Sequence, residues 1–170
     1  MTSIDLRNIR IQTGEQLRDT HALELDPFEF GGQRYVIEPE VPEAQLTTTR
    51  TTSGFVFELA FVVRIAGPCF RCLADTGIDL SLKGREYHAT GEEEPDEDLR
   101  TPYVQETTLD LSTWARDAIA LALPEKILCR PDCAGLCATC GRDLNLEPHT
   151  HDETELDPRW AALAELKDRL

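Results

Sequence analysis

Apolar and polar positions alternate through the segment FVFELAFVVRIA, residues 55–66. A period of two over this length predicts a β-strand that buries one face and exposes the other. Glu58 and Arg64 fall on the polar face, and Gly67 with Pro68 ends the run. The apolar face consists of every odd position, namely Phe55, Phe57, Leu59, Phe61, Val63 and Ile65.

A second alternation follows at Ile78, Leu80 and Leu82. We expect this segment to run back beside the first strand, so that the two form a β-hairpin. The turn between them contains Cys69 and Cys72. The pattern therefore predicts that a cysteine-bearing turn closes this hairpin.

The first fifty residues carry weaker signals. Residues 23–25 and 35–37 are short apolar runs that we interpret as strands, separated by a turn at Gly31 and Gly32. Residues 39–52 are rich in Pro, Thr and Glu, and we expect a loop there.

A helical period appears only in the second half of the chain. Within residues 109–126, one helical face carries the apolar residues Leu111, Trp114, Ala115, Ala118, Ile119 and Ala122. Ser112 is the candidate N-cap, and a proline at position 124 stops the helix. A last helix is predicted to begin at positions 157–158, where Asp-Pro is a typical helix start.

Six acids and one proline occupy residues 92–98, EEEPDED. Such a run is expected to form a solvated loop. We therefore predict a mainly β region at residues 1–91, an acidic loop at 92–98, and a helical region with a cysteine knuckle at 99–170, all in one folded unit. The fold class is α+β: an antiparallel sheet or partial β-barrel in the N-terminal half, with helices in the C-terminal half.

The chain has 170 residues and a formal net charge of −15. Residues 1–90 carry a net charge of −4 and residues 91–170 carry −11. An acidic surface repels nucleic acid on average and attracts basic proteins. No apolar run reaches the roughly 20 residues that span a bilayer, and the first 20 residues are charged throughout, so we expect a cytoplasmic protein.

Four of the six cysteines lie within twelve residues, in the segment CRPDCAGLCATCG. Thiols stay reduced in the cytosol, so metal binding is favoured over a disulfide framework. Four thiolates suit a closed tetrahedral Zn²⁺ site, and Gly141 after the last C-x-x-C pair permits a tight turn. We expect one zinc ion, held by the local set Cys129, Cys133, Cys137 and Cys140.

The upstream C-x-x-C pair leaves a second ligand set open, with Cys69 and Cys72 joined to Cys137 and Cys140. Short loops cost less closure entropy, which favours the local set. Reduced thiols without a metal are the remaining interpretation. His149 and His151 follow the knuckle in an acidic stretch, and we expect them in a solvated loop rather than at the metal.

No phosphate-binding loop, dinucleotide-binding motif, zinc-protease helix or nucleophile elbow is present in the sequence. The carboxylates occur in runs rather than as a positioned acid and base pair. These patterns give no reason to expect an enzyme.

The sequence PCFRCL at residues 68–73 and a block from residue 109 to residue 167 resemble the YceD family. The block contains LDLSTWARDAIALALPEKILC, DCAGLCATCGRDLN and DPRWAALAELK. The family is named for a role in the accumulation of large-subunit ribosomal RNA. The resemblance implies a non-enzymatic factor in ribosome assembly.

Two mechanisms are consistent with that implication. In the first, the protein binds pre-ribosomal RNA through basic residues that would surround the metal if both cysteine pairs meet; these are Arg64, Arg71, Lys83, Arg85, Lys126, Arg130 and Arg142. In the second, it is an acidic zinc-binding chaperone for a basic large-subunit ribosomal protein. A third interpretation is a subunit of a nuclease complex, and the sequence leaves all three open.

Overall fold

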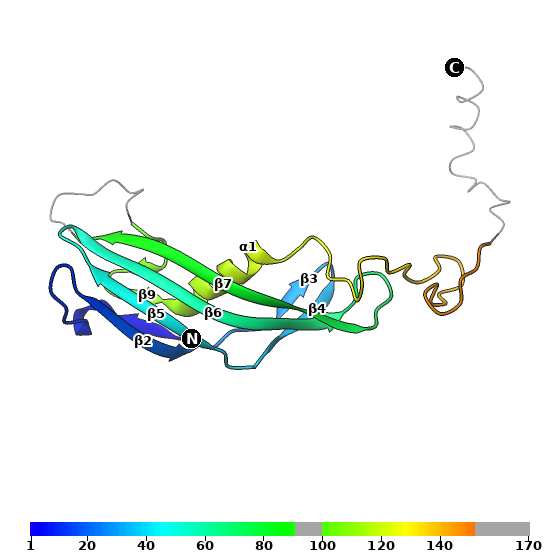
Figure 1. Cartoon of the computed structure of the whole chain (residues 1–170), viewed down its shortest axis with the longest axis horizontal. Coiled ribbons are helices and arrows are strands. Elements are labelled where there is room, and N and C mark those ends of the chain that lie inside the picture. The colour runs from blue at the N-terminus through cyan, green and yellow to red at the C-terminus, as the bar shows by residue number, and fades with distance from the viewer. Residues whose placement is uncertain (91–99, 152–170) are drawn as a thin grey trace, which may run out of the picture.

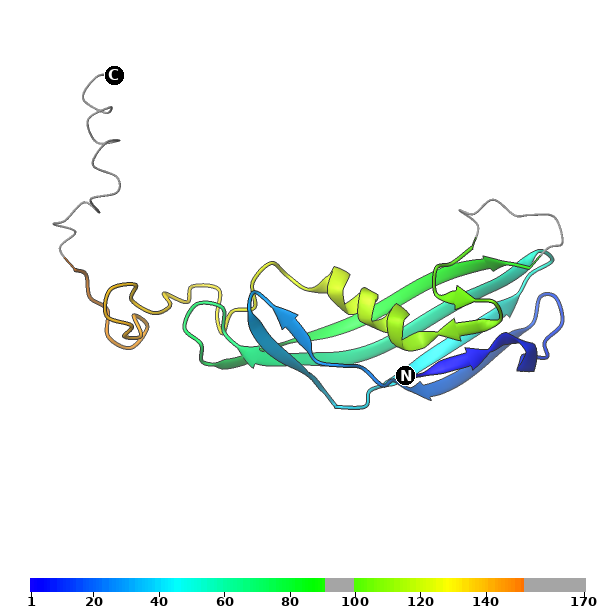
Figure 2. The same ribbon diagram turned by 180° about the vertical axis from the view of Figure 1, so that it is seen from behind.

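The computed structural model describes residues 1–90 and 100–151. Most of the described chain forms antiparallel β-structure (Figures 1 and 2). The larger sheet has six strands, in the order β2-β5-β6-β4-β3, with β7 on the other edge of β6. Their bounds are β2 (Gln16–Ala22), β3 (Phe28–Phe30), β4 (Gln33–Glu38), β5 (Glu43–Arg50), β6 (Gly54–Pro68) and β7 (Asp75–Ala89).

The hairpin of β6 and β7 is the longest element of the fold. Each strand has 15 residues, and the register runs without a break from Gly54 opposite Ala89 to Pro68 opposite Asp75. The predicted hairpin is confirmed, including the cysteine-bearing turn that closes it. The odd positions of β6 from 55 to 65 are buried, as their alternation predicted.

The opposite edge of β6 is shared by two strands. β5 pairs with its first half and β4 with its last residues, while β2 extends the sheet beyond β5. The predicted loop over residues 39–52 is wrong, because most of it is β5. Its buried side chains alternate at Ala44, Leu46 and Thr48, and β-branched threonine favours strands.

The N-terminal strand prediction is also corrected. β2 ends at Ala22, and Leu23 lies just beyond it, fully buried, with its N–H donating to the Pro42 carbonyl at 2.8 Å. Burial rather than strand geometry explains that apolar run. The short strand at 35–37 is confirmed within β4, and Gly31 and Gly32 form the turn before it, both at positive φ.

A second layer covers the inner face of the large sheet. It consists of a three-stranded sheet, in the order β1-β9-β8, and one α-helix. The elements are β1 (Ser3–Asp5), the 3-10 helix η1 (Leu6–Asn8), β8 (Val104–Gln105), β9 (Thr108–Asp110) and α1 (Leu111–Ala122). Figure 2 shows α1 lying across the strands of the large sheet.

The helix α1 begins at a different cap from the predicted one. Asp110 is the N-cap, and its carboxylate accepts from the Thr113 N–H at 2.9 Å. Ser112 lies inside the first turn, where its hydroxyl donates to the Glu24 carbonyl and accepts from the Thr2 N–H. The predicted stop is confirmed, since the helix ends at Ala122, two residues before the proline.

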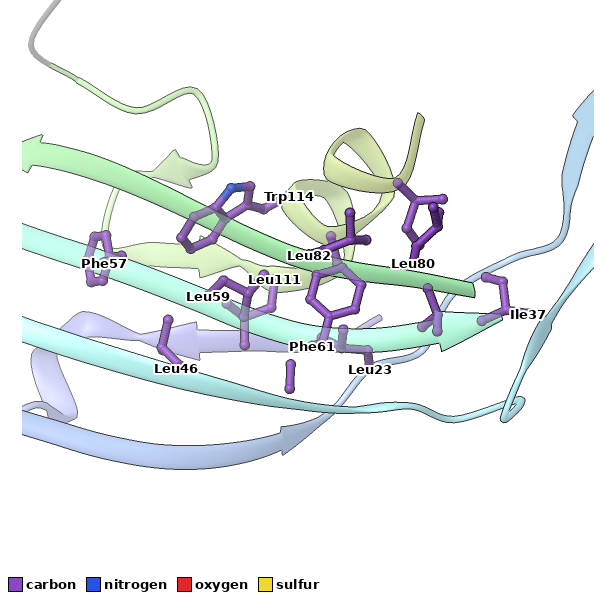
Figure 3. Close-up of a cluster of buried hydrophobic side chains, with 14 of the residues drawn as sticks. Leu23, Ile37, Leu46, Phe57, Leu59, Phe61, Leu80, Leu82, Leu111 and Trp114 are labelled. Atoms are coloured by element: carbon purple, nitrogen blue, oxygen red, sulfur yellow. The ribbon is translucent and has the colours of Figure 1, made fainter. Parts of the chain in front are cut away.

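The core lies between the two layers (Figure 3). Phe57, Leu59 and Phe61 of β6 face Leu111 and Trp114 of the covering layer. A β-carbon at position 84 of β7 would come within 2.9 Å of the indole nitrogen of Trp114. Glycine is therefore required there for the helix to approach the hairpin closely.

The α+β prediction is corrected toward a mostly β fold. The described residues contain one α-helix rather than several, and residues 123–151 form turns with only an isolated β-bridge. The described strands form two antiparallel sheets, and neither closes into a barrel. The predicted acidic loop and the predicted last helix lie outside the described residues.

Within the described ranges, no helix is both long and apolar enough to pass through a bilayer.

The edge of β7 that faces away from β6 forms one isolated β-bridge in the described part of the chain, between His88 and Arg100.

Replacing Phe57 by alanine tests the packing between the two layers. Phe57 is fully buried near the start of β6, so we expect the free energy of unfolding to fall by about 3–5 kcal/mol. Val62→Ala is the matched control, because Val62 lies on the outer face of the same strand and is 63% exposed. Its effect should stay within about 0.5 kcal/mol. Urea denaturation measures both, and equal effects would contradict this packing.

Candidate metal centre

The turn between β6 and β7 holds Cys69 and Cys72 at the end of the hairpin. Pro68 ends β6, and the Cys69 N–H then donates to the Ala74 carbonyl at 2.7 Å. Leu73 takes a positive φ of 61° and returns its N–H to the Cys69 carbonyl at 3.0 Å. The tight turn points both thiols to the same side, and both side chains are buried.

The segment after α1 returns to this turn. Ile127 is buried in the main core, and its carbonyl accepts from the Phe70 N–H at 2.8 Å. Two residues later the Cys129 N–H donates to the Cys69 sulfur at 3.3 Å. Burial of Ile127 therefore delivers Cys129 to the tip of the hairpin. Figure 1 shows this segment, in yellow, running alongside that tip.

A second contact places Cys133. The Arg71 guanidinium donates to the Cys133 carbonyl at 2.7 Å, and the Arg71 carbonyl accepts from the Leu136 N–H at 3.1 Å. Gly135 adopts a φ of +80°, and a β-carbon there would lie 3.0 Å from the Arg71 carbonyl oxygen. The chain bends sharply at this glycine, two residues after Cys133.

Four sulfurs meet at this tip: Cys69, Cys72, Cys129 and Cys133 lie with their Sγ atoms all within 4.8 Å of one another. The Sγ atoms of Cys69 and Cys133 are 3.8 Å apart, and those of Cys72 and Cys129 are 3.6 Å apart. A tetrahedral zinc ion with Zn–S bonds of about 2.3 Å separates its sulfurs by about 3.8 Å. The spacing of the four thiols fits that ion.

Backbone donors favour a thiolate at the centre of this group. Burial opposes ionisation of Cys69, but backbone N–H groups of Cys72 and Cys129 lower the pKa of its thiol to about 6. Loss of hydration and contact with the Cys72 sulfur raise the pKa of Cys129 to about 12. Without a cation the group therefore resists full ionisation, and a nearby dication would favour it.

Asn145 supports the group from outside. Its side-chain nitrogen donates to the Cys133 sulfur at 3.5 Å, and its oxygen accepts from the Ala134 N–H at 2.8 Å and from Arg130 at 2.6 Å. Such outer contacts orient metal ligands. Asn145 could not be predicted from the sequence, because its position twelve residues after Cys133 carries no recognisable signal.

The structure groups the cysteines differently from both predicted sets. Cys129 and Cys133 join the upstream pair, whereas Cys137 and Cys140 lie in a separate group with His149 and His151. Neither predicted set of four is brought together. The loop-entropy argument does not apply here, because the hairpin register and the buried Ile127 already hold the distant segments side by side.

The predicted basic residues do not form one rim. Arg71, Lys126 and Arg130 lie near the four sulfurs, with the Lys126 ammonium 5.2 Å from the centre of the exposed Phe70 ring. Lys83 and Arg85 pair with Ala60 and Glu58 of β6, roughly 25–35 Å along the hairpin from Pro68.

Four of the predicted arginines form ion pairs with carboxylates. Their nitrogen-to-oxygen distances range from 3.1 to 3.7 Å, and all of the side chains are substantially exposed. The pairs are Arg64 with Asp79, Arg85 with Glu58, Arg130 with Asp132, and Arg142 with Glu147.

Together these features define a β-sheet protein in which the turn of the longest hairpin lies against the segment after the helix. Four thiols, two from each segment, cluster where the two meet. The family model for the large ribosomal RNA subunit accumulation protein YceD matches residues 57–167, and the chain belongs to this family. The match includes most of β6, all of β7 and α1, and all six cysteines.

Two mycobacterial proteins are similar to the chain. An uncharacterized protein of Mycobacterium tuberculosis (strain ATCC 25618 / H37Rv) is 38% identical over 104 residues, covering 59% of this chain and 49% of that protein. An uncharacterized protein of Mycobacterium leprae (strain TN) is 45% identical over 65 residues, covering 38% of this chain and 29% of that protein. The chain spans about half the length of the curated relatives it matches or less. No solved structure matches it significantly.

Brief oxidation of the metal-free protein tests the cysteine grouping. We expect disulfides between Cys69 and Cys133 or between Cys72 and Cys129, because those sulfurs are already within 4 Å. Peptide mapping by mass spectrometry identifies the bonds. Predominant bonds from Cys129 or Cys133 to Cys137 or Cys140 would contradict the grouping.

Proposed function

We propose that this protein is a non-enzymatic factor in the accumulation of large-subunit ribosomal RNA. The observation that carries the proposal is the family match over residues 57–167, which includes the hairpin, the helix and both cysteine-bearing segments. A site of four thiolates around one ion leaves no open coordination position for a substrate. The chemistry of the tip therefore supports a structural role rather than catalysis.

In this proposal, Cys69, Cys72, Cys129 and Cys133 hold a structural Zn²⁺ ion. Three of the four side chains are buried, and the sulfur spacing matches the tetrahedral ion. The ion would fasten the segment after α1 to the hairpin. Because binding and folding are coupled in such sites, the metal would stabilise the tip rather than take part in a reaction.

Contact with RNA is proposed at the hairpin tip. Residues 68–75 and 124–151 contain four basic and five acidic side chains, a net charge of −1 in a chain whose total is −15. Phosphate binding needs local positive charge, so this end of the molecule is the part least opposed to RNA. Of the basic residues here, Arg71 contacts a carbonyl group and Lys126 contacts an aromatic ring. Arg130 and Arg142 instead pair with carboxylates.

The charge distribution also favours a second candidate, an acidic chaperone for a basic large-subunit ribosomal protein. Several of the predicted RNA-binding arginines already pair with carboxylates, and the molecule as a whole carries a strong negative charge. Such a surface attracts basic proteins at long range. In this candidate the effect on ribosomal RNA would be indirect.

Single substitutions test the proposed zinc site. Cys133→Ser should abolish zinc binding at the four-cysteine group, because it removes a fully buried ligand. Asn145→Ala should weaken zinc affinity about 10- to 100-fold, since it removes the side chain that contacts the Cys133 sulfur. Competition with a chromogenic chelator measures both. Leu146→Ala is the control, as Leu146 is adjacent and exposed, and its affinity should match the unsubstituted protein.

Two charge-matched variants separate the candidate mechanisms. Arg71→Gln with Lys126→Gln removes two positive charges at the tip, and Lys83→Gln with Arg85→Gln removes two far along the hairpin. If the tip binds single-stranded RNA, only the first variant should lower the salt dependence of binding, by roughly 1.4 in the slope of log K against log salt. Filter binding to fragments of large-subunit RNA measures the slopes, and zinc content checks folding.

Crosslinking in cells, with both RNA and protein identified, complements that measurement. Crosslinks from the tip to ribosomal RNA that diminish in the Arg71 and Lys126 variant support direct binding. Crosslinks mainly to a basic ribosomal protein, unchanged in that variant, would contradict direct RNA binding and favour the chaperone.

A further inference from the structure

A second group of metal-binding side chains lies beyond the four-cysteine group. The sulfurs of Cys137 and Cys140 and one ring nitrogen each of His149 and His151 all lie within 4.8 Å of one another. None of the four belongs to the first group. Two thiols and two imidazoles form one of the common donor sets of structural zinc sites.

The thiols of this group lie on a tight turn. The Gly141 N–H donates to the Cys137 carbonyl at 2.8 Å, and Gly141 takes a φ of +72°. Backbone N–H groups of Cys140 and Thr139 donate to the Cys137 sulfur. The Cys137 N–H in turn donates to the Arg142 carbonyl at 2.8 Å. This turn presents two sulfurs on one side and supports a thiolate.

The histidines are oriented toward those sulfurs. His149 Nδ1 lies 2.7 Å from the Glu147 carbonyl oxygen, which can only accept, so Nδ1 carries the proton. The lone pair of His149 is then on Nε2, which is 3.1 Å from the Cys140 sulfur. A backbone carbonyl that fixes the ring in this way is the usual outer partner of a metal-bound histidine. The His151 ring lies edge-on to His149, with the ring centres 5.0 Å apart.

We propose that Cys137, Cys140, His149 and His151 bind a second Zn²⁺ ion, separate from the four-cysteine site. Around a tetrahedral ion, sulfur and nitrogen ligands lie about 3.6 Å apart, so Cys140 and His149 need separate by only about half an ångström. Four protein ligands close the coordination sphere, which makes the site structural.

The segment itself lacks another source of order. Residues 136–151 contain one isolated β-bridge, between Leu136 and Asp143, and no strand or helix. Leu146 is 80% exposed, and Cys137 is the only buried side chain of the segment. A segment that buries so little apolar surface gains little from the hydrophobic effect, whereas ion binding can supply the free energy that folds it.

The decisive experiment counts metal ions in the full chain. Native mass spectrometry of zinc-replete protein should give two ions per chain. His149→Ala with His151→Ala should give one, because two thiolates alone leave half of the coordination sphere open. Thr150→Ala is the matched control, since Thr150 is exposed between the two histidines, and it should retain two ions.

Cobalt substitution identifies which ion is lost. The ion that remains in the double histidine variant should show the spectrum of a four-sulfur site, and the ion lost should account for the mixed sulfur and nitrogen bands. Two ions retained in the double histidine variant would overturn the second site. A single ion in the unsubstituted protein that survives the histidine substitutions would also overturn it, and would leave the four-cysteine site intact.

Discussion

The register between β6 and β7 is the constraint on which the rest of the structure depends. Fifteen consecutive pairs hold the two strands, and a slip by one residue would turn every buried side chain of β6 to the outside. The same register places the hairpin turn at one end, with its two thiols on one side. The core and the cysteine group are therefore two consequences of one strand pairing.

The elements with a strong period could be predicted from the sequence, and the elements without one could not. β6, β7 and α1 each bury one regular face, so their alternation or helical stripe is visible. β2 exposes most of its side chains, and its position comes from pairing with β5 rather than from its own pattern. The strand β5 was not predicted because its threonines made the segment read as polar, although β-branched threonine is favoured in half-buried strands.

The cysteine motifs predicted a cluster of thiols, but they did not predict which cysteines lie together. Spacing within C-x-x-C determines which two thiols share a side, whereas the choice of the other two depends on long-range packing. Here Ile127 and Arg71 make that choice, one by burial in the core and the other by two hydrogen bonds across the tip. The spacing of the cysteines along the sequence does not reveal either contact. The proximity of His149 and His151 to Cys137 and Cys140 was not predicted either, because the acidic sequence around the histidines favoured a solvated loop.

The strand β7 has a further consequence for how the molecule behaves among copies of itself. It pairs with β6 on one side, and over most of its 15 residues its other backbone edge is unpaired within the described chain. A long free edge invites strand addition and aggregation. Lys83, Arg85 and Glu86 place charge along that edge, which penalises an approaching strand by desolvation and repulsion. Lys83 and Arg85, which were predicted as RNA-binding residues, can thus protect the protein against self-association.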